Sequence, residues 1–148
     1  MPAKKARICM AIGQVSDIEE RVGVAPKYIK AELFTGRRKR KLGDAGGISQ
    51  FGVNYTTLEP GAYSALRHWH EGEDEFIYVL EGRLTLIDDD GEHELRPGSF
   101  CGFPAGDSNA HHVMNAGDTP AVFLELGSRR PGEDTVHYPD DDFGPIER

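Results

Sequence analysis

Residues 60–82 read PGAYSALRHWHEGEDEFIYVLEG, and the order of residue types in them is the best single guide to this structure. Side chains two positions apart on a β-strand point to the same face, so His68 and His70 are predicted to face the same way. The polar segment 71–74 contains a glycine and suits a turn, and Glu75 then opens an apolar run that is typical of a returning strand. Two imidazoles and one carboxylate are therefore predicted to meet at one metal ion.

This stretch resembles the first motif of the cupin superfamily: a glycine, five spacer residues, His-x-His, three or four residues, a glutamate, six residues and a second glycine. His68, His70, Glu75 and Gly82 fit it. Six residues separate Gly61 from His68 instead of five, a departure that a bulge or a longer turn would absorb. A lone His-x-His is common by chance, whereas the ordered set of motif residues is not.

The second cupin motif is also matched in order. Its elements are Gly98, the segment 104–106 (Pro-Ala-Gly), His111 and Asn115. Four residues separate Gly106 from His111 where the motif has two, and strict counting would place Asn109 at the position of the histidine. The motif's spacing from histidine to asparagine favours His111 over its neighbour.

His112 remains the alternative for the last ligand position. Adjacent residues on a strand face opposite sides, so only one of His111 and His112 can enter the site. Val113 shares a face with the first and Met114 with the second, and both faces are apolar, so alternation does not decide between them.

The resemblance implies an all-β fold, a double-stranded β-helix or jelly-roll barrel, and it covers roughly residues 48–126. It also implies one divalent transition metal ion (Zn, Mn, Fe, Ni or Co) bound by three imidazoles and a carboxylate, a shell that leaves coordination positions open for substrate. The implied ligands are His68, His70, Glu75 and His111. No catalytic residue is assigned, although Tyr63 and Cys101 lie near the motifs.

The chain divides into three predicted parts: an irregular arm over residues 1–47, the barrel over 48–126 and a polar tail over 127–148. A short helix is expected at residues 18–22, capped by Ser16 or Asp17. Short strands separated by Gly, Pro and Asp turns are expected around residues 51–57, 63–70, 75–80, 83–88, 92–95, 99–103, 110–115 and 120–126.

Composition narrows the possible partners. The 148 residues carry a net charge of −8, which argues against nucleic-acid and anionic-membrane binding, and no segment approaches transmembrane length. Cys9 and Cys101 are far apart and read as reduced thiols of a cytoplasmic protein. The basic run 37–41 is either a solvated edge strand or a site for an anionic ligand.

The resemblance suggests a metal-dependent, isomerase-like protein of small-molecule metabolism, similar in outline to sugar-phosphate-isomerase-like cupins. Its ligand would be a compact polar molecule such as a sugar or sugar phosphate. An Fe(II)-dependent dioxygenase and a non-catalytic metabolite-binding cupin are the alternatives. Cupins commonly pair through edge strands and arms, so a homodimer is also expected.

Overall fold

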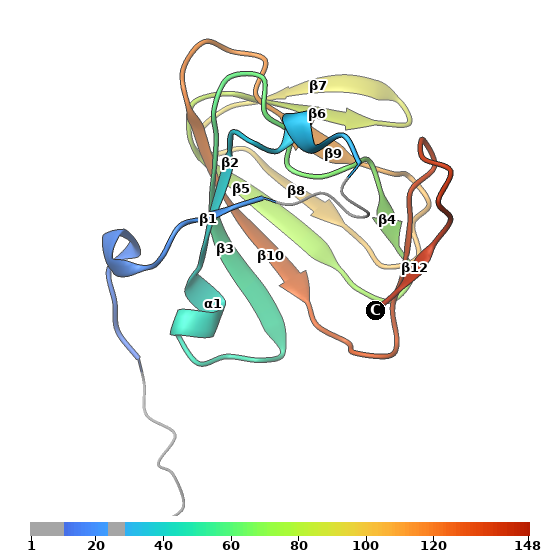
Figure 1. The fold of residues 1–148 in the computed structure, drawn as a ribbon, viewed down its shortest axis with the longest axis horizontal. Helices are drawn as coiled ribbons and strands as arrows, with labels where there is room; N and C mark the ends of the chain where they lie inside the picture. The colour runs from blue at the N-terminus through green and yellow to red at the C-terminus, as the bar shows by residue number, and fades with distance from the viewer. Residues whose placement is uncertain (1–10, 24–28) are drawn as a thin grey trace, which may run out of the picture.

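The computed structural model describes residues 11–23 and 29–148, so Cys9 lies outside the described residues. Short strands dominate the fold (Figure 1). They are β1 (Arg21–Val22), β2 (Arg37–Lys41), β3 (Phe51–Leu58), β4 (Trp69–His70), β5 (Glu75–Glu81), β6 (Leu84–Asp88), β7 (Gly91–Leu95), β8 (Phe100–Phe103), β9 (His112–Met114), β10 (Ala121–Ser128), β11 (Thr135–His137) and β12 (Ile146–Glu147). Among the described residues, helical structure is limited to α1 (Leu42–Ala45) and two 3₁₀ turns, Val15–Asp17 and Ala31–Leu33.

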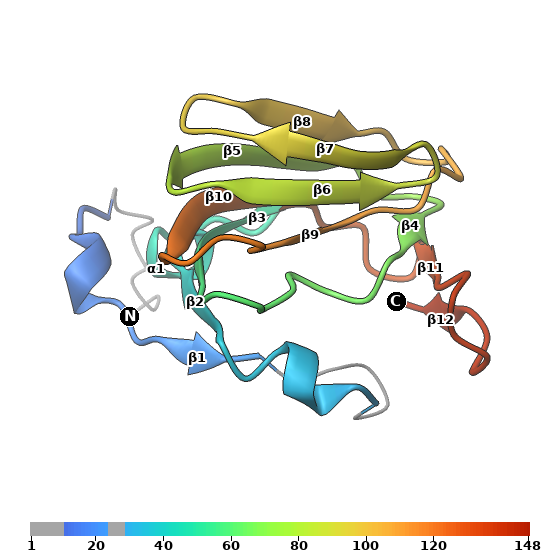
Figure 2. The same ribbon diagram turned by 90° about the horizontal axis from the view of Figure 1, so that it is seen from above.

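Three antiparallel sheets form the barrel. The largest has the strand order β1-β2-β3-β10-β5-β8, and two three-stranded sheets have the orders β7-β6-β9 and β12-β11-β4. Figure 2 shows β6 and β7 lying alongside β5 and β8, with β11 and β12 beside β4 at one end of the molecule. Non-consecutive neighbours such as β3-β10-β5 are the crossovers of a jelly roll. The predicted all-β jelly roll is confirmed.

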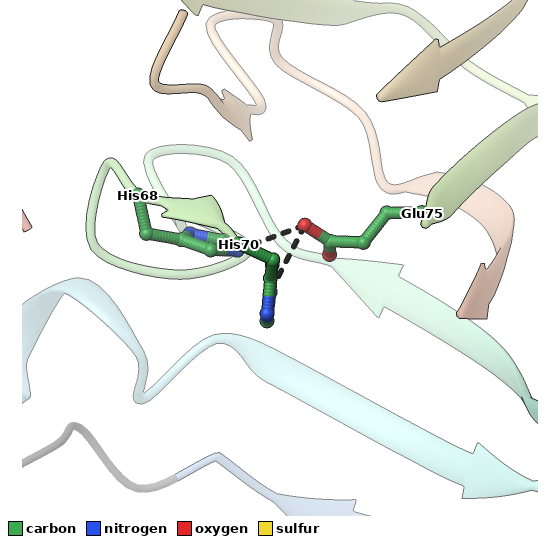
Figure 3. Close-up of side chains that lie close together, drawn as sticks. All are labelled: His68, His70 and Glu75. Atoms are coloured by element: carbon green, nitrogen blue, oxygen red, sulfur yellow. Dashed lines mark ion pairs between the residues drawn. The ribbon is translucent and has the colours of Figure 1, made fainter. Parts of the chain in front are cut away.

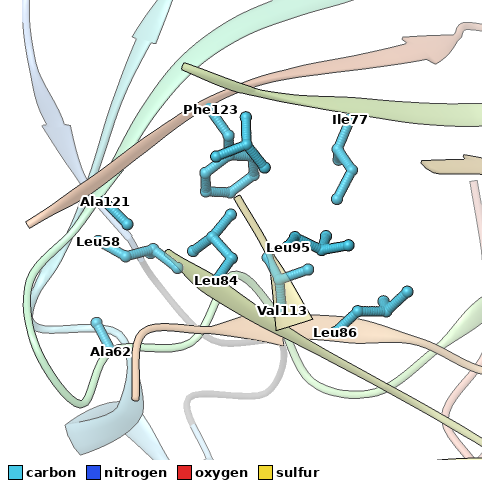
Figure 4. Packing of buried hydrophobic residues seen from close by; sticks show 10 residues of the cluster. Leu58, Ala62, Ile77, Leu84, Leu86, Leu95, Val113, Ala121 and Phe123 are labelled. Carbon is cyan, nitrogen blue, oxygen red and sulfur yellow. The ribbon is translucent and has the colours of Figure 1, made fainter. Parts of the chain in front are cut away.

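The barrel is closed around an apolar core that follows from strand alternation. On β5, Ile77 and Val79 are buried, whereas the residues between and beside them face outward and are exposed. The core residues that the two facing sheets contribute pack together in Figure 4. They are Leu58, Ala62, Ile77, Val79, Leu84, Leu86, Leu95, Val113, Ala121 and Phe123.

The predicted helix at residues 18–22 is wrong. A 3₁₀ turn ends at Asp17, Ile18 is extended, and Arg21 and Val22 form β1 against β2. Neither Ser16 nor Asp17 caps a helix there. The guanidinium of Arg40 instead donates to the carbonyls of Val15 (3.0 Å) and Ile18 (2.8 Å). These carbonyls are therefore satisfied by a side chain of the sheet, and the segment gains nothing by becoming helical.

Segments outside the predicted barrel also join the sheets. β2 pairs with β3, and β11 pairs with β4 through Val136 opposite His70. The division into an arm (1–47) that packs on the barrel or on a partner subunit, a barrel (48–126) and a tail (127–148) stays a proposal that truncation can test. Within the described part of the chain, no helix is long and apolar enough to cross a membrane.

Candidate metal centre

Three elements bring the candidate ligands together. His70 is the last residue of β4, and Glu75 is the first residue of β5 after the predicted turn. His68 and His111 face each other in an isolated antiparallel bridge, with backbone N–H···O distances of 3.1 and 2.9 Å between them. The strand β4 pairs with β11 and not with the returning strand β5, which lies in another sheet, yet the side chains of these elements meet at one point.

The four side chains converge on one atom. Glu75 Oε1 lies 3.2 Å from Nε2 of His68, 3.1 Å from Nε2 of His70 and 3.0 Å from Nε2 of His111. Figure 3 shows the first two imidazoles pointing at this carboxylate from the side opposite to β5. All three histidines are buried, and the ring of Phe103 stacks on His111 with 3.6 Å between centroids.

The protonation of these histidines makes the cluster fit a cation. His68 Nδ1 is 2.7 Å from the carbonyl oxygen of Leu66, and His70 Nδ1 is 2.7 Å from Oδ2 of Asp134. Both partners can only accept, so each Nδ1 carries the proton, and in the neutral imidazole each Nε2 presents a lone pair. These lone pairs face the buried Oε1 of Glu75, which receives no hydrogen bond from any described residue. Acceptors aimed at one another repel unless a cation lies between them, so the donor set suits a divalent metal ion.

Electrostatics keep this donor set ready to bind. Burial acts to raise the pKa of Glu75, but the three imidazoles outweigh it and hold that pKa well below its usual range. Burial lowers the pKa of His111. Burial also acts to lower the pKa of His70, but the carboxylates of Glu75 and Asp134 outweigh it and raise that pKa. The carboxylate is thus ionised near neutrality, and a proton on His70 is a competitor of the metal.

His112 and Asn109, the two alternatives at the last position, lie elsewhere. His112 Nδ1 is 2.9 Å from the carbonyl oxygen of Ala65, and its ring packs on Tyr63. Asn109 accepts from the backbone N–H of Asp89 and donates to Asp88. The residues between Gly106 and His111 that exceed the motif's spacing lie in the loop that contains Asn109. His111 therefore joins the cluster, and its role as a ligand stays a prediction.

A cavity of about 770 Å³ opens beside the cluster and is lined by all four of its side chains. A smaller space of about 80 Å³ is lined by His70, Glu75 and His111. The larger cavity is big enough for a small metabolite, and its wall changes from apolar residues such as Phe123 and Val136 to charged ones on β2.

Comparison with known proteins assigns the family. Residues 54–127, half of the chain, match the cupin domain family. This chain belongs to the cupin family. The predicted superfamily resemblance is thus confirmed.

The proteins that this cupin resembles are named for different activities. It is 47% identical to a sugar phosphate isomerase of the cupin superfamily from Silicibacter pomeroyi, with a TM-score of 0.81 over 90% of this chain and 88% of that one. Oxalate decarboxylase OxdC from Bacillus subtilis is 37% identical over 47% of this chain and 19% of its own length. The oxalate-binding protein of Thermotoga maritima is 35% identical over 47% of this chain and 54% of its own. The chain spans less than two thirds of the curated relatives it matches.

Asp134 is the residue near the centre of this cupin that sequence reasoning missed. Its side chain is fully buried, with Oδ2 on His70 Nδ1 and Oδ1 accepting from the backbone N–H of Gly72 at 2.9 Å. A second possible ligand group, His70 with Glu73 and Asp134, shares this histidine. No local pattern marks Asp134, because it reaches the site only when β11 pairs with β4.

The other candidates from the sequence take different places. Cys101 is partly buried in β8, and burial raises the pKa of its thiol, which argues against a reactive thiolate. Tyr63 packs on His112 outside the cluster. In the C-terminal tail, His137 stacks on Trp69 and bonds to the carboxylate of Glu71, so it lies outside the cluster.

Proposed function

We propose that this cupin is a metal-dependent isomerase of sugars or sugar phosphates, with one divalent transition metal ion bound by His68, His70, Glu75 and His111. One observation carries the proposal: two imidazoles with committed Nδ1 protons direct their Nε2 lone pairs at one buried carboxylate oxygen beside a cavity of about 770 Å³. The identity of 47% to a sugar phosphate isomerase over most of both chains supports the reaction class.

The chain's own residues would set the reaction geometry. When bound, the ion supplies Lewis acidity that polarises a carbonyl oxygen. Leu66 and Asp134 fix the two imidazoles through their Nδ1 protons, and this preorganises the site. An aldose–ketose isomerisation moves one proton between adjacent carbons, and the cavity offers Glu125 as a carboxylate that could accept and return it.

Metal content and proton exchange test the proposal. Protein purified without added metal should contain close to one divalent transition ion per chain by mass spectrometry. Incubation with ribose 5-phosphate and related aldose phosphates in D₂O should give ketose product with deuterium incorporated next to the carbonyl, as seen by NMR. Removal of the ion by a chelator should abolish the exchange, and its return should restore it. Unchanged exchange in metal-free protein would overturn the proposal, and iron with consumption of dioxygen would favour the dioxygenase.

A non-catalytic metabolite-binding cupin is the second candidate. Similarity to an oxalate-binding protein favours it. Under this alternative the same metabolites would raise the melting temperature without being converted.

We also infer a homodimer that acts in the cytoplasm, where Cys101 would stay reduced. The outer face of β5 exposes Phe76, Tyr78 and Leu80, and the ring of Phe100, which is 67% exposed, stacks on Phe76. An apolar surface of this kind on a sheet is typical of an interface. Phe100→Asp should convert a dimer to a monomer in analytical ultracentrifugation, and a monomeric wild-type protein at micromolar concentration would overturn the inference.

A further inference from the structure

The basic run in β2 is divided between the two faces of the strand. Arg38 and Arg40 face outward. Arg38 pairs with Glu20 (2.8 Å) and Glu59 (2.7 Å), and Arg40 pairs with Glu20 (3.1 Å) and with backbone carbonyls of the N-terminal segment. These two arginines attach the segment around Val15 to the sheet, and their charges are neutralised there.

The alternate residues of the same strand line the large cavity. Lys39 is opposite Thr56 and Lys41 is opposite Asn54 in the pairing of β2 with β3. Residues directly opposite each other on paired strands share a face, and Thr56 is fully buried while Asn54 lines the cavity. The two lysines therefore point inward, to the cavity that also contains the metal cluster.

The lining of the cavity is less acidic than the chain as a whole. The described side chains that line it include six lysines and arginines and four acidic residues, whereas the chain has a net charge of −8. Two of these arginines pair with carboxylates outside the cavity, Arg129 with Asp44 and Arg130 with Glu133. Glu75, one of the four acids, belongs to the metal cluster. A bound divalent ion would add further positive charge. Excess positive charge in a cleft concentrates ligands of the opposite sign, so the wall that holds the two lysines would favour an anion when the metal ion is bound.

Glu125, on β10, contacts one of these lysines and has one oxygen atom without a hydrogen-bond donor in the described part of the chain. One of its oxygens is 3.1 Å from Lys39 Nζ, and the other is buried and receives no hydrogen bond from any described residue. Gly127 is opposite Glu75 on the paired strands, so Glu125 is the diagonal neighbour of Glu75, at about 7–8 Å between backbones. The intervening glycine leaves the floor open between the two carboxylates.

We propose that Lys39 and Lys41 bind the anionic group of a hydroxylated metabolite, and that the free oxygen of Glu125 accepts a hydrogen bond from one of its hydroxyls. This deepens the proposed function and rests on it for the class of ligand, a sugar phosphate or a similar polyhydroxy anion. The binding itself is measured without turnover.

Calorimetric titration with inorganic phosphate tests the site at fixed metal content. Lys41→Met and Lys39→Met should each weaken phosphate binding by about tenfold, the usual effect of one charge-assisted hydrogen bond. Arg38→Met is the matched control, since it removes one charge from the outer face of the same strand, and it should leave the dissociation constant unchanged. Glu125→Gln should tighten phosphate binding, because it removes the acidic competitor for Lys39.

Equal weakening in the Arg38 variant, or no weakening in the two lysine variants, would overturn the site. If Lys39→Met fails to fold, because it leaves Glu125 without its partner, Lys41→Met and Glu125→Gln carry the test.

A comparison of ribose 5-phosphate with ribose, as ligands and as substrates, then separates the anion site from the isomerase activity. Phosphate binding with no conversion of any sugar phosphate would sink the isomerase and support the anion site. Conversion with an unchanged KM in the lysine variants would sink the anion site alone.

Discussion

The two ends of the barrel interior differ in chemistry although the same strands supply both. On β10, Phe123 is fully buried in the core, and two residues later on the same face Glu125 lines the cavity. On β5, Val79 is fully buried, and Glu75, on the same face of the strand, joins the metal cluster. One end of each strand therefore provides the packing that stabilises the fold, and the other end provides polar groups for a ligand.

Two glycines lie at the polar end. Gly127 and Gly52 face each other across β10 and β3, and both line the cavity. A side chain at Gly127 would contact Glu75, and one at Gly52 would contact the guanidinium of Arg129. The polar end is thus kept open by residues that add nothing to the core, and we expect substitutions at the two ends to have separable effects on stability and on metal binding.

The largest effect should come from the apolar end. Leu58→Ala leaves a cavity in the core and should lower the free energy of unfolding by about 2–5 kcal/mol, measured by urea denaturation of the metal-free protein. Glu92→Ala, at an exposed position of β7, is the control and should change it by less than about 0.5 kcal/mol. The folded fraction of the Leu58 variant should bind zinc with wild-type affinity. A reduced affinity there would show that the two ends are coupled.

At the polar end, a substitution is expected to weaken zinc binding instead of lowering stability. Glu75→Gln removes the anionic donor at the centre of the cluster and should weaken zinc binding by more than the ~10–100-fold that loss of an outer partner causes. Competition with a chromophoric chelator measures it. Glu71→Gln, which alters only the exposed pair with His137, is the control. Wild-type zinc affinity in the Glu75 variant would remove the proposed centre.

Sequence reasoning succeeded where the signal is local. Alternation and turn residues predicted β5, and the positions of His68, His70 and Glu75 in the sequence predicted that these three side chains would meet. Their role as metal ligands stays a prediction. Sequence reasoning failed where the outcome depends on pairing between distant segments. Nothing near Asp134 predicts that β11 will bring it to His70, and the inward face of the basic strand is known only from its register with β3. The predicted helix after Asp17 was lost to contacts with the side chain of Arg40.

Asp134→Asn should have a smaller effect than loss of a direct ligand. If the amide oxygen keeps the bond to Gly72, its NH₂ group faces His70 Nδ1 and forces the proton onto Nε2, the atom that faces Glu75. Zinc affinity should fall by about 10–100-fold. The exposed Glu133→Gln is the matched control from the same loop. A purely structural role would lower the unfolding midpoint and leave the zinc affinity of the folded protein unchanged, which would contradict the positioning role.

The smallest expected effect is on pH dependence, and its direction follows from the raised pKa of His70. In metal-free protein the proton on this imidazole is retained above the ordinary value of about 6.5, so its stabilising contribution is full below that value and is lost as pH rises through the raised pKa. Metal binding requires the neutral form and therefore has the opposite dependence. Zinc affinity should fall as pH decreases, beginning above 6.5, by up to about tenfold per pH unit for each proton displaced.

Glu75 should not contribute in that range, because its pKa is held well below the usual value. The pH at which affinity begins to fall therefore distinguishes the imidazole from the carboxylate as the competing group. Zinc titrations between about pH 3.5 and pH 8 at fixed ionic strength measure it. Asp134→Asn removes one of the two carboxylates that raise the pKa of His70, so the decline should begin at a lower pH in that variant. A decline that starts only in the carboxylate range, near pH 4–5, in both proteins would show that proton competition at His70 does not control the polar end of the barrel.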